Sequence, residues 1–206
     1  MTSSDFFSAH LADPPVVAIF RGQGVDATLA LARAAWEAGV DLVEVPVQTP
    51  EAVAAFRAVL AVGRERGKAV GAGTVLTVDQ VEMVAAAGGA FGVAPGFDPA
   101  VVQAASRLAL PFLPGVATAS EVGAAAALGC TWLKAFPARE LGATWAKAIK
   151  APFPQVHFVA TGGMSPANAA QFLAAGYDAV ALGNAFAHAT GIAALMAALD
   201  EWRQSA

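Results

Sequence analysis

Short apolar runs alternate along the chain with longer alanine-rich segments, and turns rich in glycine, proline or aspartate separate them. Runs this short and this apolar are typical of parallel strands that are buried on both faces. The pattern predicts eight strands, with the sequences VVAIFR (16–21), DLVEVPV (41–47), AVGAGTV (69–75), FGVAPGF (91–97), PFLPGVA (111–117), TWLKAFP (131–137), HFVATGG (157–163) and AVALGNA (179–185).

The segments between the runs carry helix start and stop signals. The expected N-caps are Asp26, Thr49, Thr77, Asp98, Thr118 and Ser165, and the glycines expected after helix ends are Gly39, Gly129 and Gly176. Eight strands, each followed by a helix, predict an α/β fold of the (β/α)₈ barrel type. Residues 3–11 are expected to form an extra helix that caps the bottom of the barrel. A doubly wound open sheet is the rival, but Gly22 and Gly24 lack the third glycine of the dinucleotide fingerprint.

Composition narrows the class of protein. The chain has 206 residues, of which 57% are hydrophobic and 14% charged, so we expect one domain over 1–206 with a large core. A net charge of -4 without basic clusters argues against a nucleic-acid partner. The lone Cys130 fits a reducing cytoplasm, and no signal peptide or membrane span is expected. The high apolar content leaves room for an oligomer interface.

Five polar residues fall near the carboxyl ends of five different predicted strands. These are Arg21, Glu44, Thr74, Lys134 and Thr161. Barrel enzymes keep their active sites at this end of the strands, so the shared position indicates a site. Each residue also has a structural alternative: Lys134 can extend its ammonium to water, Glu44 can form a buried ion pair, and threonines favour strands.

A lysine and a carboxylate at one rim are the groups that catalysis through an imine needs. An amine that an apolar pocket partly desolvates keeps a neutral fraction, which adds to a ketone and forms a Schiff base. Lys134 is the candidate amine, and Glu44 is the candidate group for moving protons. We expect no metal and no cofactor, because His10, His157 and His188 are not placed to converge at this rim.

Two glycine-containing loops follow the seventh and eighth predicted strands. The first contains Gly162 and Gly163 and leads into a helix, and the second contains Gly183 and Asn184. Loops at these two positions of a barrel often bind phosphate through backbone N–H groups and a helix N-terminus. The sequence therefore predicts a phosphate site beside the lysine strand.

Several motifs occur in the order found in one known family. The matching segments are VVAIFRG, VEVPVQTP, VGAGTVL, APGF, LPGVATASE, LKAFPA, ATGGMSPAN and ALGNAF. From about residue 16 to residue 202 the chain resembles the 2-keto-3-deoxy-6-phosphogluconate (KDPG) and 4-hydroxy-2-oxoglutarate (KHG) aldolase family, which includes 2-keto-3-deoxy-6-phosphogalactonate aldolases. The resemblance implies a class I aldolase, usually a homotrimer of (β/α)₈ barrels, that releases pyruvate and an aldehyde such as glyceraldehyde 3-phosphate.

The resemblance also implies roles for individual residues. Lys134 would form the Schiff base and Glu44 would be the general acid/base. Thr74 would bind the pyruvate carboxylate, and Thr161 would contact substrate hydroxyls. The residues implied for the phosphate are Arg21, Gly162, Gly163, Gly183 and Asn184, and the motifs further place Gln48 and Pro95 in the substrate site.

The substrate itself stays open. Gln48 stands where many phosphogluconate-type members have arginine, whereas Thr161 resembles that branch more than the galactonate branch. Asn184 stands where a serine often helps to bind phosphate. The alternatives are an aldolase for short unphosphorylated 4-hydroxy-2-keto acids, a non-catalytic phosphate-binding barrel, and a phospho-sugar isomerase or epimerase.

Overall fold

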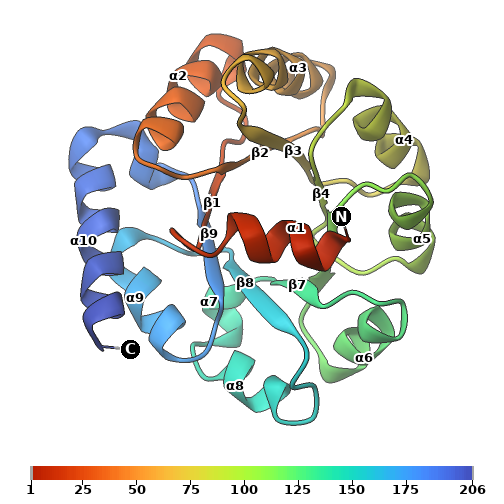
Figure 1. The fold of residues 1–206 in the computed structure, drawn as a ribbon, viewed down its shortest axis with the longest axis vertical. Coiled ribbons are helices and arrows are strands. Elements are labelled where there is room, and N and C mark those ends of the chain that lie inside the picture. The colour runs from red at the N-terminus through yellow and green to blue at the C-terminus, as the bar shows by residue number, and fades with distance from the viewer. Residues whose placement is uncertain (1, 206) are drawn as a thin grey trace.

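The computed structural model of the chain describes residues 2–205, so the first and last residues of the predicted 1–206 domain lie outside the described range. All strand pairs are parallel, and the sheet runs in the order β5-β4-β3-β2-β1-β9-β8-β7-β6, a nearly closed barrel ringed by helices (Figure 1). This confirms the predicted (β/α)₈ fold. The strands are β1 (Val16–Ile19), β2 (Leu42–Pro46), β3 (Ala69–Gly73), β4 (Gly92–Val93), β5 (Phe112–Leu113), β6 (Gly115–Val116), β7 (Trp132–Ala135), β8 (His157–Thr161) and β9 (Ala179–Leu182).

The predicted fifth strand, 111–117, is split into two at Pro114. Proline has no N–H to donate to a ladder, so the strand cannot continue through it as a regular element. The first half pairs with β4 and the second with β7. The junction is bridged by hydrogen bonds from Gly115 N to Gly96 O (3.1 Å) and from Lys134 N to Pro114 O (2.8 Å). Residues 2–205 therefore contain nine short strands where eight were expected.

The helices occupy the segments predicted for them. They are α1 (Ser3–His10), α2 (Gly24–Glu37), α3 (Pro50–Glu65), α4 (Val78–Ala87), α5 (Pro99–Arg107), α6 (Ala119–Ala127), α7 (Ala138–Leu141), α8 (Trp145–Lys150), α9 (Pro166–Ala174), the 3₁₀ helix η1 (Asn184–Ala187) and α10 (Ala189–Ser205). Five expected N-caps, Thr49, Thr77, Asp98, Thr118 and Ser165, are confirmed. Asp26 is a correction: Gln23 is the N-cap of α2, and Asp26 lies in its first turn.

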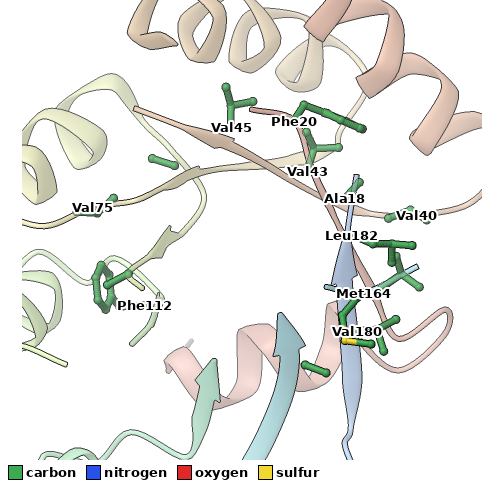
Figure 2. Packing of buried hydrophobic residues seen from close by; sticks show 14 of the residues in the cluster. Ala18, Phe20, Val40, Val43, Val45, Val75, Phe112, Met164, Val180 and Leu182 are labelled. Atoms are coloured by element: carbon green, nitrogen blue, oxygen red, sulfur yellow. The ribbon is translucent and has the colours of Figure 1, made fainter. Parts of the chain in front are cut away.

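The apolar residues of the strands form two layers. Outward-facing residues pack against the ring of helices, as Ala18, Val43 and Val180 do in Figure 2. Inward-facing residues fill the lower half of the barrel, where the cluster includes Leu42, Phe91 and Trp132.

Helix α1 closes the lower end of the barrel, as expected for residues 3–11, and ends at His10. It lies across the barrel axis in Figure 1. Phe6 and Phe7 on this helix join the inner cluster, and the indole N–H of Trp132 donates to Ser8 Oγ (3.0 Å). Access to the barrel interior is therefore left at the opposite end, where the strands finish. Of the helices within residues 2–205, none is long and apolar enough to cross a membrane.

Candidate active site

Buried polar side chains gather where the strands end. Within residues 2–205 five polar or charged residues are buried, and four of them were predicted as site residues: Glu44, Thr74, Lys134 and Thr161. They come from β2, from the residue after β3, from β7 and from the end of β8. Because buried polar groups are costly in a protein core, this concentration marks a site.

A cleft of about 480 Å³ opens at this end of the barrel. The predicted residues that line it are Arg21, Lys134, Thr161, Gly162, Gly163, Gly183 and Asn184. Phe20, Phe136 and Met164 add an apolar wall. The lining also includes Gln23, which is not predicted as a site residue because a single amide in a loop carries no recognisable sequence signal.

Four predicted residues do not line this cleft: Glu44, Gln48, Thr74 and Pro95. Glu44 is buried, and the charges of the cleft residues Lys134 and Arg21 act on its carboxyl group. Gln48 and Thr74 accept hydrogen bonds from Arg21, which lines the cleft. Pro95, in the loop between β4 and α5, packs against the backbone of Gly115 beside the split strand.

Lys134 carries its amine into the upper half of the barrel. The side chain is 3% exposed, and Nζ lies 5.3 Å from the centroid of the Phe136 ring. No hydrogen bond or salt bridge joins this amine to another of residues 2–205. Strand alternation places Trp132 and Phe136 on the same face as Lys134, which predicts an amine between two aromatic rings. In the structure the Phe136 ring lies near the amine. The Trp132 ring belongs to the lower cluster, where it stacks on His157 with ring centroids 4.8 Å apart.

Glu44 is a buried carboxyl group that makes no hydrogen bond or salt bridge with the rest of residues 2–205. The residue is 1% exposed, and within residues 2–205 its Oε1 has no hydrogen-bond partner. Burial raises its pKa, and the charges of Lys134 and Arg21 offset part of that rise. A structural ion pair with either cation is not present among the described residues. The environment instead suits a group that both gives and takes protons during a reaction.

The space for this carboxyl group comes from Gly73 on the neighbouring strand. A Cβ at position 73 would lie 2.1 Å from Glu44 Oε1, well inside contact distance. The two residues lie on paired strands, because Glu44 is in register with Gly71 and Pro46 with Gly73. Gly73, the second glycine of the GAGTV motif, is therefore required by the carboxyl group of Glu44 beside it.

Arg21, Gln48 and Thr74 form a hydrogen-bonded group at the ends of three adjacent strands, β1, β2 and β3. Arg21 Nη1 donates to Gln48 Oε1 (2.8 Å), and Nη2 donates to Thr74 Oγ1 (3.4 Å). Thr74 has a φ of 58°, a left-handed conformation that is rare for a β-branched residue. Strain of this kind is concentrated at functional sites.

The two glycine loops follow the adjacent strands β8 and β9, and β9 pairs with β1, the strand that leads to Arg21. Gly162 and Gly163 have φ values of 94° and 72°, which glycine adopts without steric cost, and their loop leads into α9. Gly183 and Asn184 lead into η1, a 3₁₀ helix of four residues. The backbone at this end of the cleft therefore has the form expected for binding an anion.

Metal-binding side chains do not cluster among residues 2–205, where no group of three or more histidine, cysteine, aspartate or glutamate residues lies close enough to hold an ion. His10 ends α1 and His188 follows η1. His157 begins β8, and its Nδ1 lies 3.0 Å from Asp178 Oδ1.

Comparisons with known proteins identify the family of the chain. The sequence model of the family described as KDPG and KHG aldolase matches residues 8–197. A probable 2-dehydro-3-deoxy-6-phosphogalactonate aldolase of Rhizobium meliloti (strain 1021) is 36% identical over 171 residues, covering 82% of this chain and 80% of the relative. The KHG/KDPG aldolase of Escherichia coli (strain K12) is 38% identical over 162 residues, covering 78% and 75%.

A solved structure extends the likeness over the whole chain. It is the KDPG aldolase of Legionella pneumophila, with pyruvate captured as a covalent carbinolamine intermediate. The TM-score is 0.80 at 28% identity, and the match covers 100% of this chain and 98% of that one.

Proposed function

The chain belongs to the KDPG and KHG aldolase family, and is thus a lyase, and from this premise we propose that it cleaves a 2-keto-3-deoxy-6-phospho sugar acid to pyruvate and glyceraldehyde 3-phosphate. The observation that carries the proposal is the buried amine of Lys134, which has no salt bridge within residues 2–205 and lines the cleft. A lysine is rarely buried in this way without a partner or a use.

The proposed reaction needs two groups, the amine of Lys134 and a carboxyl group that carries protons. The amine of Lys134 adds to the C2 ketone to give a carbinolamine, which loses water and becomes an iminium ion. The C3–C4 bond then breaks. Its electron pair moves into the C2–C3 bond to form an enamine, while the C4 hydroxyl loses its proton and becomes the aldehyde. Protonation of the enamine at C3 and hydrolysis of the imine release pyruvate and restore the amine.

Glu44 is the proposed carrier of these protons. Its raised pKa, caused by burial, keeps the protonated acid available at a higher pH than for an exposed glutamate. The same carboxyl can donate to the departing hydroxyl of the carbinolamine and accept from the C4 hydroxyl. Its attraction to Lys134 and Arg21 keeps the ionised form accessible as well.

The proposed substrate contacts follow the two sides of the cleft. Thr74, with Gln48 nearby, binds the carboxylate, and Thr161 contacts the hydroxyl groups. The backbone at the two glycine loops, together with Asn184, binds the phosphate. Arg21, which also lines the cleft, supplies positive charge to the phosphate. Pro95 shapes the rim beside the split strand.

The direct test traps the imine. Borohydride reduction in the presence of pyruvate is expected to add a reduced pyruvyl group to Lys134, seen by peptide mass spectrometry. Lys134→Arg is expected to abolish both the adduct and turnover, because a guanidinium stays charged and cannot form the imine. Lys147→Arg, at an exposed lysine of α8, is the matched control and is expected to retain both.

The outcomes separate the alternatives. An unmodified Lys134 in the parent protein contradicts the proposal. A protein that binds inorganic phosphate but releases no pyruvate is a non-catalytic barrel, and one that shifts protons without breaking a carbon–carbon bond is an isomerase or epimerase.

A second candidate is cleavage of a shorter, unphosphorylated 4-hydroxy-2-keto acid such as 4-hydroxy-2-oxoglutarate. It is favoured by Gln48 and Asn184, which stand where arginine and serine are frequent in phosphate-using members, and by the KHG name of a relative. Comparing kcat/KM for gluconate-derived and galactonate-derived phosphorylated substrates with that for 4-hydroxy-2-oxoglutarate decides among the three.

We also propose that the chain is one domain that acts as a homotrimer in the cytoplasm. Support comes from family membership, the 57% hydrophobic composition and exposed apolar side chains such as Leu76, which is 52% exposed. Light scattering is expected to give three times the monomer mass, and a monomer mass contradicts the proposed assembly.

A further inference from the structure

Two glycine carbonyls in the loop between β8 and α9 are held by hydrogen bonds from neighbouring helices. Gly162 O accepts from the backbone N–H of Arg139 in α7 (3.1 Å). Gly163 O accepts from the side-chain amide of Asn168, whose Nδ2 lies 3.0 Å away in the first turn of α9. Gly162, Gly163 and Met164 line the cleft, whereas its described lining includes no residue of α7 or α9. Both carbonyls are therefore directed to helices outside the cleft.

The direction of each carbonyl decides the direction of the next N–H group. In a planar trans peptide, the C=O of one residue and the N–H of the following residue point in opposite directions. The N–H of Gly163 therefore points away from α7, and the N–H of Met164 points away from α9. Neither N–H group has a hydrogen-bond partner within residues 2–205. Two backbone donors of cleft-lining residues are thus available to an anion.

The glycines do not select this arrangement by themselves. Gly163 has a φ of 72°, and glycine adopts positive and negative φ about equally well. The peptide between Gly163 and Met164 can therefore turn over, which would place a carbonyl oxygen where the N–H now points. The amide of Asn168 opposes this turn, and it is itself held because its Oδ1 accepts from Ser165 N (2.8 Å).

The hydrogen bond from Asn168 is more than a helix cap requires. Four helices begin with a capping box, and the residues at the third position of these helices are Asp5 (α1), Gln80 (α4), Glu121 (α6) and Asn168 (α9). In a capping box this side chain accepts from backbone N–H groups, as Gln80 does from Leu76 N (2.6 Å) and Thr77 N (3.2 Å). The NH₂ of Gln80 makes no hydrogen bond within residues 2–205, whereas that of Asn168 donates to a carbonyl of the glycine loop.

We infer that Asn168 is a positioning residue, whose side-chain amide holds the Gly163 carbonyl on the α9 side of the loop and so keeps the Met164 N–H available to the phosphate of the substrate. The inference rests on the proposed function, because that function brings a phosphate to this loop. Asn168 does not line the cleft and acts only through the backbone of the loop.

The test removes the amide without adding a charge. In Asn168→Ala the dissociation constant for inorganic phosphate, measured by calorimetric titration, is expected to rise about tenfold, because a hydrogen bond to a charged group is lost. This factor corresponds to about 1.4 kcal/mol. For the phosphorylated substrate, KM is expected to rise by a similar factor while kcat stays within about twofold of the parent, the pattern of a lost binding contact. A general loss of structure would lower kcat as well.

Gln80→Ala is the matched control. It also removes an uncharged amide from the third position of a helix with a capping box, but that amide makes no contact with the loop between β8 and α9. Its dissociation constant for inorganic phosphate is expected to stay within about twofold of the parent, although both variants lose a capping contact worth about 1 kcal/mol of stability. Thermal melting checks that both are folded and equally affected.

Three results overturn the inference: parental phosphate binding in Asn168→Ala, an equal loss of phosphate binding in Gln80→Ala, or a parent protein that binds no phosphate. Failure of the proposed function looks different. In that case the parent forms no borohydride adduct at Lys134 and releases no pyruvate. The phosphate titration depends on neither reaction, so it still decides the role of Asn168.

Discussion

Glycine 73 shows how one residue without a side chain can set the chemistry of a site. Its Cα faces the carboxyl group of Glu44 so closely that a methyl group would lie 2.1 Å from Oε1. The carboxyl is thus held in a space that no other residue type would leave open. The second glycine of the GAGTV motif, on β3, leaves open the volume that the side chain of Glu44 on β2 occupies.

We expect Gly73→Ala to lower kcat about 100-fold, because displacing a catalytic group by about 1 Å can cost that much. The crowded strand is also expected to lose about 1 to 3 kcal/mol of stability. Steady-state kinetics and urea unfolding measure the two effects. Gly123→Ala is the control, since a Cβ there would meet Phe153 at an ordinary 3.5 Å. Parental kcat in Gly73→Ala would show that Glu44 is not held in this way.

The buried carboxyl of Glu44 also makes stability depend on pH. Because burial raises its pKa in the folded state, the folded protein keeps this proton over a pH range in which the unfolded chain has lost it. In that window, above the ordinary value of 4.5, stability falls as pH rises. The positive charges of Lys134 and Arg21 reduce the effect without removing its cause.

We expect Glu44→Gln to be about 1 to 3 kcal/mol more stable than the parent at pH 8, because an amide cannot ionise, whereas the buried carboxyl must be charged in the core or hold its proton above its ordinary pKa. The difference should shrink as pH falls toward 4.5, where the parent carboxyl is protonated too. Melting temperatures of the parent and the variant between pH 4.5 and pH 8 measure the difference in stability. The variant should also be less active than the parent, because an amide cannot carry the protons of the proposed reaction. A difference that does not change with pH would contradict this account.

The sequence reveals which residues reach the rim but not how they meet. Glu44, Lys134 and Thr161 are predictable because strand alternation and the carboxyl-end rule need only local pattern. The lack of a partner for Glu44 depends on a glycine in another strand, and the Arg21–Gln48 bond depends on the register of adjacent strands. Such contacts between elements have no local signal.

At the scale of elements, α1 acts as the floor of the barrel. Phe7 is fully buried among Phe6, Phe91 and Trp132, so eight residues outside the repeating pattern complete the inner core. The lower half of the barrel is thus a packed core in which the strands need a helix from outside the repeat.

We expect Phe7→Ala to lose about 3 to 5 kcal/mol of stability, the usual cost of removing a buried phenylalanine. Because α1 lies at the end opposite to the cleft, kcat/KM should stay near the parental value at temperatures where the variant is folded. Urea unfolding and kinetics at low temperature measure both. Phe153→Ala, at a half-buried ring, is the control and should lose less; equal losses would mean that α1 is not a core element.

Two element boundaries differ from the sequence expectation for identifiable reasons. Aspartate is favoured both at an N-cap and within the first turn of a helix, so Asp26 alone does not fix the start of α2. The residues 111–117 contain a continuous apolar pattern, but Pro114 has no N–H to donate to a neighbouring strand. Pairing to different neighbours on each side of a proline is visible only in three dimensions.

At the scale of the whole molecule, charge is distributed unevenly. The chain carries a net charge of -4, yet the described residues that line the cleft include two cations, Arg21 and Lys134, and no aspartate or glutamate. A cleft with this local sign attracts anions even in an acidic protein. This suits a substrate with a carboxylate at one end and, in the proposed reaction, a phosphate at the other.

Helix α1, which closes the lower end of the barrel, affects the path by which substrate and products enter and leave. With that end closed, one opening serves for both entry and exit, and Lys134 lies below the glycine loops that flank it. In the proposed reaction the aldehyde fragment occupies the outer position, while the pyruvate fragment is still covalently attached to the amine. The aldehyde must therefore depart first and, in the synthetic direction, arrive second, because the covalent bond to Lys134 holds the pyruvate fragment until the imine is hydrolysed, and the single opening makes both fragments use the same path.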